Sequence, residues 1–106
     1  MNGSQAHILD LIREKAKAIT PKGSKVYLFG SRARGDAHQD SDWDILVLLD
    51  KQEIALSDYD EVSYPLREVG WDNGEIINTV IYTVKDWQQN SFTPFYKNVM
   101  KEGILL

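Results

Sequence analysis

A nearly continuous apolar run at residues 43–49, WDILVLL, constrains the fold of this chain more than any other feature. The run has the length of a β-strand and is much shorter than the roughly 18 apolar residues of a membrane span. A strand with one solvent face would alternate apolar and polar residues, whereas this run contains a single polar residue. Both of its faces should therefore be covered, which places the strand inside a sheet that carries helices.

The flanking sequence supplies further elements. Residues 8–19 repeat apolar side chains at helical spacing, with lysines and glutamates between them, and predict an amphipathic helix. Residues 25–29, KVYLF, predict a short buried strand. Residues 75–84, EIINTVIYTV, are rich in β-branched side chains and predict a third strand. Helices and strands thus alternate along the chain.

A second helix is predicted to begin after Ser57, which would cap its first turn. Pro65 lies inside the pattern and should bend or break this helix. The residues expected to form its buried stripe are Tyr59, Val62, Leu66 and Val69. The segment 85–101 predicts one or two short helices, interrupted near Pro94.

The chain length predicts that residues 1–106 form one small α/β domain, because 106 residues are enough for a single core. The absence of cysteine excludes disulfides and thiolate metal sites. Charges near the N-terminus argue against a signal peptide, so a cytoplasmic, membrane-free protein is expected. The net charge of −4 argues against broad binding to a nucleic-acid backbone and leaves nucleic acid only as an acceptor substrate.

Two carboxylates lie one residue apart at the start of the central strand. Side chains at i and i+2 of a strand point to the same face, so Asp42 and Asp44 should project together while Trp43 points to the opposite face. Paired carboxylates suit Mg²⁺, which completes its shell with water and substrate phosphates. The pattern indicates a magnesium site at the end of a sheet.

A Gly-Ser pair supplies a complementary feature where the 25–29 strand ends. Gly30 lets a phosphate approach the backbone closely, and Ser31 can open a short helix whose N–H groups and hydroxyl hold phosphates. Arg32 and Arg34 follow as candidate charge-neutralising groups. The two features together predict a site for a metal-bound nucleoside triphosphate.

Gly30-Ser31, ten intervening residues and Asp42-Trp43-Asp44 resemble the signature of the DNA polymerase beta-like nucleotidyltransferase superfamily, in particular its minimal nucleotidyltransferase branch. The resemblance implies a small mixed β-sheet with helices packed on it, as in the polymerase palm. It implies that Asp42 and Asp44 bind Mg²⁺ and act in catalysis, and that Gly30 and Ser31 contact the nucleotide. The implied reaction moves a nucleoside monophosphate from NTP, with ATP the expected donor, to a hydroxyl acceptor. A helical HEPN-domain partner, in an antitoxin-like role for this chain, is also implied.

The third acidic residue of the superfamily is missing. Asn78 occupies its expected position on the 75–84 strand, and an amide cannot act as a general base at neutral pH. Glu75 is a poor substitute because it falls on the opposite strand face. An alternative function is therefore a non-catalytic module that binds nucleotide or masks a partner, with a degenerate third metal ligand.

Overall fold

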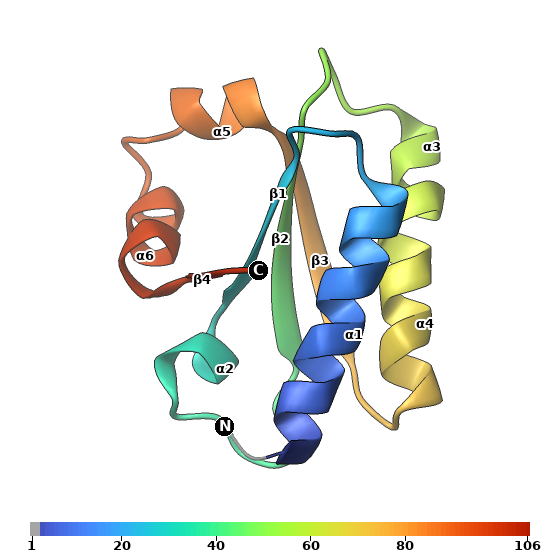
Figure 1. Ribbon diagram of the computed structural model, residues 1–106. Helices are drawn as coiled ribbons and strands as arrows, with labels where there is room; N and C mark the ends of the chain where they lie inside the picture. The colour runs from blue at the N-terminus through green and yellow to red at the C-terminus, as the bar shows by residue number, and fades with distance from the viewer. Residues whose placement is uncertain (1–2) are drawn as a thin grey trace.

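Four strands form one mixed sheet, in the order β3-β2-β1-β4, in the computed structural model, which describes residues 3–106 (Figure 1). β1 (Lys25–Phe29) is antiparallel to β2 (Trp43–Leu49), which is parallel to β3 (Ile77–Thr83). The short β4 (Ile104–Leu105) pairs antiparallel with β1. Every residue of β2 except Asp44 is buried, so the predicted strand with two covered faces is confirmed.

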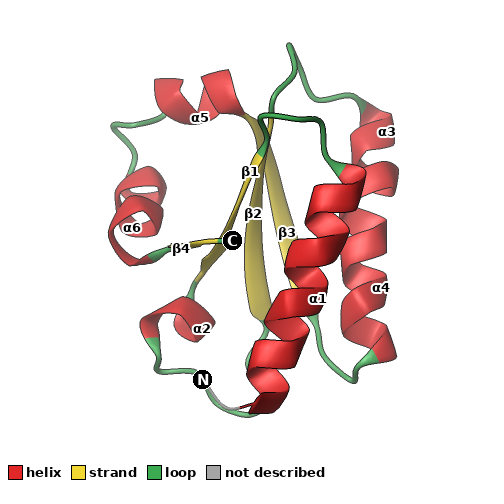
Figure 2. Cartoon of the chain, in the orientation of Figure 1, coloured by secondary structure: helices red, strands yellow, loops and turns green. Residues whose placement is uncertain are grey.

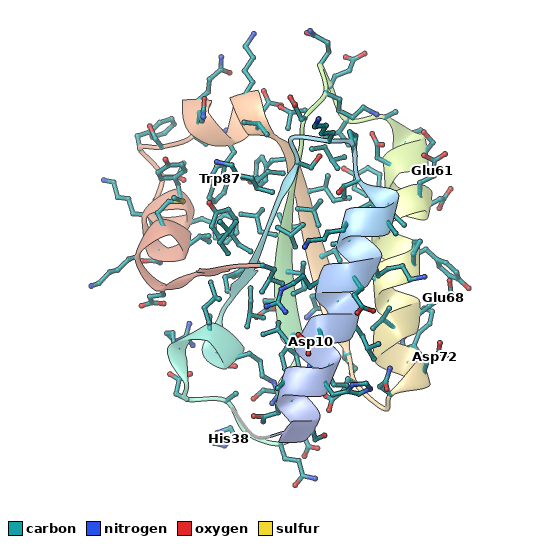
Figure 3. The ribbon with its side chains drawn as sticks, viewed as in Figure 1. Asp10, His38, Glu61, Glu68, Asp72 and Trp87 are labelled. Atoms are coloured by element: carbon teal, nitrogen blue, oxygen red, sulfur yellow. The ribbon has the colours of Figure 1, made fainter. Side chains whose placement is uncertain are left out.

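Two long helical segments cover one face of this sheet (Figure 2). They are α1 (Gly3–Ile19), which confirms the predicted first helix, and α4 (Tyr64–Asp72). The acidic side chains of Glu68 and Asp72, from α4, and of Glu61, from the preceding π-helical turn, lie on the outer side of this layer (Figure 3). The larger core lies between helices and sheet and includes Ile8, Ile12, Ala16, Leu28, Trp43, Ile45, Val47, Leu49 and Leu66.

Two shorter helices, α5 (Val84–Gln89) and α6 (Pro94–Glu102), lie on the other side of the sheet, where the sequence predicts an interruption near Pro94. Thr83 and Thr93 cap them by accepting hydrogen bonds from backbone N–H groups through their hydroxyls. Trp87 is buried between these helices and the strands and anchors a smaller, largely aromatic core. This second core fixes α6 beside β1.

The segment from Leu56 to Asp72 differs from its prediction. It comprises α3 (Leu56–Asp58), a π-helical turn η1 (Tyr59–Ser63) and then α4. The wider π turn rotates the preceding residues relative to the buried stripe. Tyr59 is therefore 52% exposed instead of buried, and Asp58 takes the inward position. Pro65 lies in the first turn of α4, where its missing N–H is tolerated.

The predicted serine cap is also wrong, because Ser57 lies inside α3. The backbone N–H of Ala55 donates instead to the Asp58 carboxylate, at 2.7 Å. The Lys51 ammonium group donates to both oxygens of the same carboxylate, at 2.9 and 3.0 Å. These hydrogen bonds, that of Lys51 foremost, lower the pKa of Asp58 against the opposing effect of burial.

Replacing Asp58 tests this cap. We expect Asp58→Ala to lower the free energy of unfolding by about 2 kcal/mol at neutral pH, because the first turn loses its cap and its partner lysine. A carboxyl with a lowered pKa stabilises the fold only while ionised. The loss should therefore be full above about pH 5 and fade as the pH falls through the folded-state pKa.

Urea unfolding at pH 7 and pH 3 measures this effect, and Asp60→Ala, at an exposed neighbouring position, is the control. Equal losses for Asp58→Ala at both pH values would contradict the ionised cap.

The remaining differences concern element ends. β3 begins at Ile77 and stops at Thr83, so Glu75, Ile76 and Val84, which were predicted to belong to this strand, lie outside it. β4 was not predicted, because two residues carry no periodicity. No helix within residues 3–106 is long and apolar enough to cross a membrane.

Candidate active site

The turn after β1 brings the backbone close to a carboxylate. Gly30 has φ +74° and precedes the short helix α2 (Ser31–Arg34). A Cβ at Gly30 would overlap the Oδ2 atom of Asp44. Glycine is needed here for both reasons, since other residues rarely adopt this φ and no room exists for a side chain.

We expect Gly30→Ala to lower the free energy of unfolding by about 2 kcal/mol, from backbone strain and displacement of the Asp44 carboxylate. Gly35→Ala is the matched control. Gly35 also has a positive φ, +86°, but nothing lies within 4 Å of the position that an added methyl group would take. Both variants should lose stability, and only Gly30→Ala should also alter metal or nucleotide binding. Thermal unfolding and calorimetry measure the two effects, and equal binding by both variants would contradict the overlap.

Asp42, Asp44 and Asn78 lie together on the face of the sheet that carries α6. Asp44 is paired in register with Phe29 of β1 on one side and with Asn78 of β3 on the other. The Asn78 amide Nδ2 donates to Asp42 Oδ2 at 2.9 Å and, more weakly, to Asp44 Oδ1 at 3.4 Å. The intervening Trp43 is fully buried on the opposite face. One amide thus bridges the two predicted metal ligands.

The Asp44 carboxyl is electrostatically perturbed. Burial raises its pKa, the hydrogen bond from Asn78 opposes this, the charge of Asp42 adds to the increase, and Arg34 partly offsets it. A carboxylate that is partly buried beside a second carboxylate favours a bound cation. The raised pKa of Asp44 therefore fits a position that binds a cation.

The protein supplies only part of the coordination shell that Mg²⁺ needs. Two carboxylates are the number that Mg²⁺ takes when substrate phosphates and water complete its shell. Within residues 3–106, no group of three or more His, Cys, Asp or Glu side chains is arranged to hold a metal. The Nδ2 end of the Asn78 amide faces the two carboxylates, so its carbonyl oxygen could bind a metal there only after a flip of the side-chain amide. A metal at this position would depend on oxygens from its substrate.

Arg32 and Arg34 lie in different environments. The Arg32 side chain is only 3% exposed, and it donates to the carbonyl oxygens of Gln39 and Ser41. It also lies 3.6 Å from the Glu75 carboxylate and 4.6 Å from the centre of the Trp43 ring. Its Nε and Nη2 donors are therefore engaged by groups inside the protein.

Arg34, by contrast, is 42% exposed in its side chain and makes surface ion pairs. It lies 3.2 Å from Asp36 and 3.7 Å from Glu102 of α6. Such exposed pairs are weak and exchange readily for a stronger anion. Of the two arginines, Arg34 is the one available to a phosphate.

Ser31 begins α2 and is partly exposed. The first helical hydrogen bonds run from the N–H groups of Ala33 and Arg34 to the carbonyl oxygen of Gly30. The N–H groups of Ser31 and Arg32 precede these bonds, as first-turn donors of a helix do. They are located where the sequence predicts phosphate contacts.

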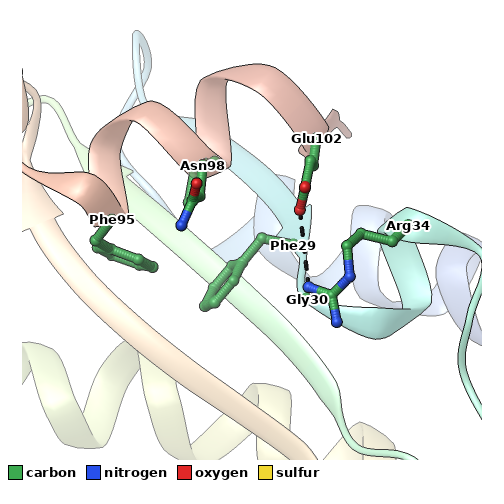
Figure 4. A pocket seen from close by; sticks show the side chains of 7 residues that line it. Phe29, Gly30, Arg34, Phe95, Asn98 and Glu102 are labelled. Atoms are coloured by element: carbon green, nitrogen blue, oxygen red, sulfur yellow. Dashed lines mark ion pairs between the residues drawn. The ribbon is translucent and has the colours of Figure 1, made fainter.

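A pocket of about 440 Å³ opens beside Gly30 (Figure 4). It lies between α6 and the end of β1, and its lining includes Phe29, Arg34, Phe95, Asn98 and Glu102. The α6 residues were not among the predicted site residues, because nothing in the sequence shows that the C-terminal helix folds back over the Gly-Ser turn. The hydrogen bond from Trp43 Nε1 and the ion pair from Arg32 to Glu75 were also missed, because no local pattern shows that these distant residues meet.

The profile of the "Polymerase beta, Nucleotidyltransferase" family matches residues 12–106. A candidate protein adenylyltransferase of Methanocaldococcus jannaschii is 33% identical over 82 residues, which make up 77% of this chain and 76% of that protein. The family match therefore includes the Gly-Ser turn, the Asp-Trp-Asp strand and α6.

Solved structures share the fold. A candidate nucleotidyltransferase from Sulfolobus solfataricus superimposes with a TM-score of 0.62 at 27% identity, covering 96% of this chain and 81% of that one. A toxin–antitoxin crystal structure with AMP-PNP contains a chain with the same TM-score, 0.62, at 20% identity; the match covers 91% of this chain and 69% of the other. With its mixed sheet and the family match over nearly all of its length, this chain belongs to the polymerase beta-type nucleotidyltransferases and is an enzyme of that family.

Proposed function

We propose that the protein transfers a nucleoside monophosphate from Mg²⁺-bound ATP to a hydroxyl group of a partner protein. The acceptor oxygen bonds to the α-phosphorus, the bond from that phosphorus to the bridging oxygen breaks, and pyrophosphate leaves with its electron pair. The observation that carries the proposal is the convergence of Asp42 and Asp44 with Gly30, where an added Cβ would overlap the Asp44 carboxylate. A triphosphate on the Gly-Ser turn would therefore lie beside both carboxylates.

Each residue has a distinct role in this proposal. Asp42 and Asp44 would hold the metal, which when bound supplies positive charge to the reacting phosphate. Gly30 and Ser31 would hold the terminal phosphates through backbone N–H groups and the serine hydroxyl. Arg34 would exchange its surface ion pairs for the triphosphate. Arg32 would support the site from within the protein rather than contact the nucleotide.

The acceptor is proposed to be a helical HEPN-domain protein, with this chain as the antitoxin-like member of a cytoplasmic pair. Two comparisons support a partner protein as the acceptor: one relative bears the name of a protein adenylyltransferase, and one structural neighbour comes from a toxin–antitoxin structure with AMP-PNP.

Asn78 favours a second candidate, a module that binds nucleotide or masks its partner without transfer. A third carboxylate at this position could take the proton of the acceptor hydroxyl, whereas the amide cannot. Transfer in the present site would require an acceptor that loses its proton to solvent or to a group of the partner.

Calorimetric titration with AMP-PNP, with and without Mg²⁺, tests nucleotide binding, which both candidate functions assume. We expect binding that requires Mg²⁺ and that Asp42→Asn abolishes, with Asp40→Asn, an exposed loop aspartate, as the control. Transfer of label from α-labelled ATP to a co-expressed partner then separates the candidates. Binding by Asp42→Asn as tight as by the wild type would end the proposal.

Asn78→Asp should make metal binding stronger. Without metal, the variant loses the hydrogen bonds from the Asn78 amide to Asp42 and Asp44 and places three carboxylates together. Their repulsion should lower the free energy of unfolding by about 1–2 kcal/mol. With Mg²⁺, affinity should rise about tenfold, because the site gains a charged ligand. Thermal unfolding with EDTA and with Mg²⁺ measures both effects. Asn78→Ala removes the donor without adding charge, and an equal response of the two variants to Mg²⁺ would contradict the expectation.

A further inference from the structure

The pocket beside Gly30 has a charged end and an aromatic end (Figure 4). At the charged end, Arg34 and Glu102 lie 3.7 Å apart. At the aromatic end, the rings of Phe29 and Phe95 meet edge to face, with centroids 5.3 Å apart and an interplanar angle of 74°. Both rings are partly exposed. A nucleotide has the same division, with an anionic and an aromatic end.

The position of the pocket relative to the carboxylates sets the direction in which a nucleotide would lie. Phe29 is the register partner of Asp44, so the two side chains are neighbours on one face of the sheet. Gly30 lies at the charged end, in the adjacent turn, and a Cβ added to it would overlap the Asp44 carboxylate. A nucleotide with its phosphates on the Gly-Ser turn can therefore extend its base across Phe29 toward Phe95 and α6.

Asn98 is the polar group at this aromatic end. It projects from α6 between Phe95 and Glu102 (Figure 4), and its side chain has no hydrogen-bond partner among residues 3–106. An asparagine amide carries a donor and an acceptor on one planar group. This pair matches the N6 amino group and the N7 atom of adenine, whereas guanine presents two acceptors at the same edge.

We propose that this pocket binds the base of the nucleotide and that Asn98 selects adenine over guanine. The inference rests on the proposed function, because it assumes phosphates at the Gly-Ser turn. Contact of the base with Phe29 and Phe95 supplies affinity that does not depend on which base is bound, as base–aromatic contacts do in nucleic-acid-binding proteins. The amide of Asn98 supplies the discrimination.

Calorimetry with four Mg²⁺-bound ligands tests the inference: ATP, GTP, 7-deaza-ATP and inorganic tripolyphosphate. The wild type should bind ATP about tenfold more tightly than GTP or 7-deaza-ATP, which lacks the N7 acceptor. Asn98→Ala should weaken ATP about tenfold, abolish the preference over 7-deaza-ATP, and leave tripolyphosphate unchanged. Alanine keeps the helix, and Lys97→Ala, at an exposed α6 position outside the pocket, is the matched control.

A second measurement separates failure of the inference from failure of the proposed function. Adenosine, without phosphate or metal, should shift the side-chain amide resonance of Asn98 at concentrations about tenfold lower than inosine requires, because inosine presents only acceptors at this edge. Tripolyphosphate binding without discrimination by Asn98 would overturn the inference and leave the function intact. An adenosine-specific shift without any tripolyphosphate binding would support the pocket and overturn the function. If neither occurs, both are wrong.

Discussion

Asp44→Asn is expected to reduce nucleotidyl transfer about 1,000-fold or more while leaving the protein folded. The loss follows from removing one of two carboxylates that would hold the metal against the reacting phosphate, an interaction of several kcal/mol in the transition state. Asparagine keeps the size of the side chain and an oxygen that can accept the hydrogen bond from Asn78. Release of pyrophosphate from ATP, with the partner protein present, measures the loss.

The stability of the same variant supplies an internal control. Burial is the foremost cause of the raised pKa of Asp44, with the nearby Asp42 adding to it. A carboxyl with a raised pKa contributes stability below its unfolded-state value, near pH 4, and loses that contribution as the pH rises through the folded-state value. Ionised Asp44 therefore destabilises the metal-free protein at pH 7.

Asp44→Asn should accordingly unfold at a higher temperature than the wild type in EDTA at pH 7, and this difference should disappear near pH 3. Gain of stability together with loss of activity is typical of a functional carboxylate. Loss of stability at pH 7 would show that Asp44 is a structural residue.

Removal of the two arginines should affect different properties: loss of Arg32 should reduce stability, and loss of Arg34 should reduce nucleotide affinity. Arg32→Ala is expected to lower the free energy of unfolding by about 3 kcal/mol, because the carbonyl oxygens of Gln39 and Ser41 lose a buried charged donor and Trp43 loses its cation. Arg32→Lys should recover little, since one ammonium group cannot reproduce the planar fork. Urea unfolding measures both.

Arg34→Ala is the matched control, two residues away on the same short helix. Its ion pairs are exposed, so stability should change by less than about 1 kcal/mol. Affinity for Mg²⁺·AMP-PNP should fall about tenfold through loss of a charge-assisted contact. Similar stability losses for Arg32→Ala and Arg34→Ala would show that the buried network contributes little.

The sequence by itself determined the three longer strands and the placement of the two acidic residues on one face. The β2 run had no polar alternation, and the alternation of strand side chains is enough to place Asp42 and Asp44 on one face and Trp43 on the other. The position of Asn78 beside them also followed from the family pattern, and its bonds to both carboxylates agree with it. The strands and the shared face of the two aspartates needed only local geometry, whereas the position of Asn78 needed the family pattern.

Elements whose form depends on distant contacts could not be predicted. The π turn at Tyr59–Ser63 shifted the buried stripe by one residue, and the cap came from Asp58 and Lys51 across a loop. The two-residue β4 exists only because β1 offers it an edge. No local propensity encodes any of these.

The environment of each charged side chain was likewise decided by the tertiary structure. Arg32 and Arg34 read alike in the sequence, but one is enclosed by Trp43 and two loop carbonyls while the other faces solvent. The aromatic pocket exists because α6 packs on Phe29 through its second core. Residue order fixes which face of a strand a side chain takes; burial, and the availability of a charge to a ligand, depend on which distant segments pack around it.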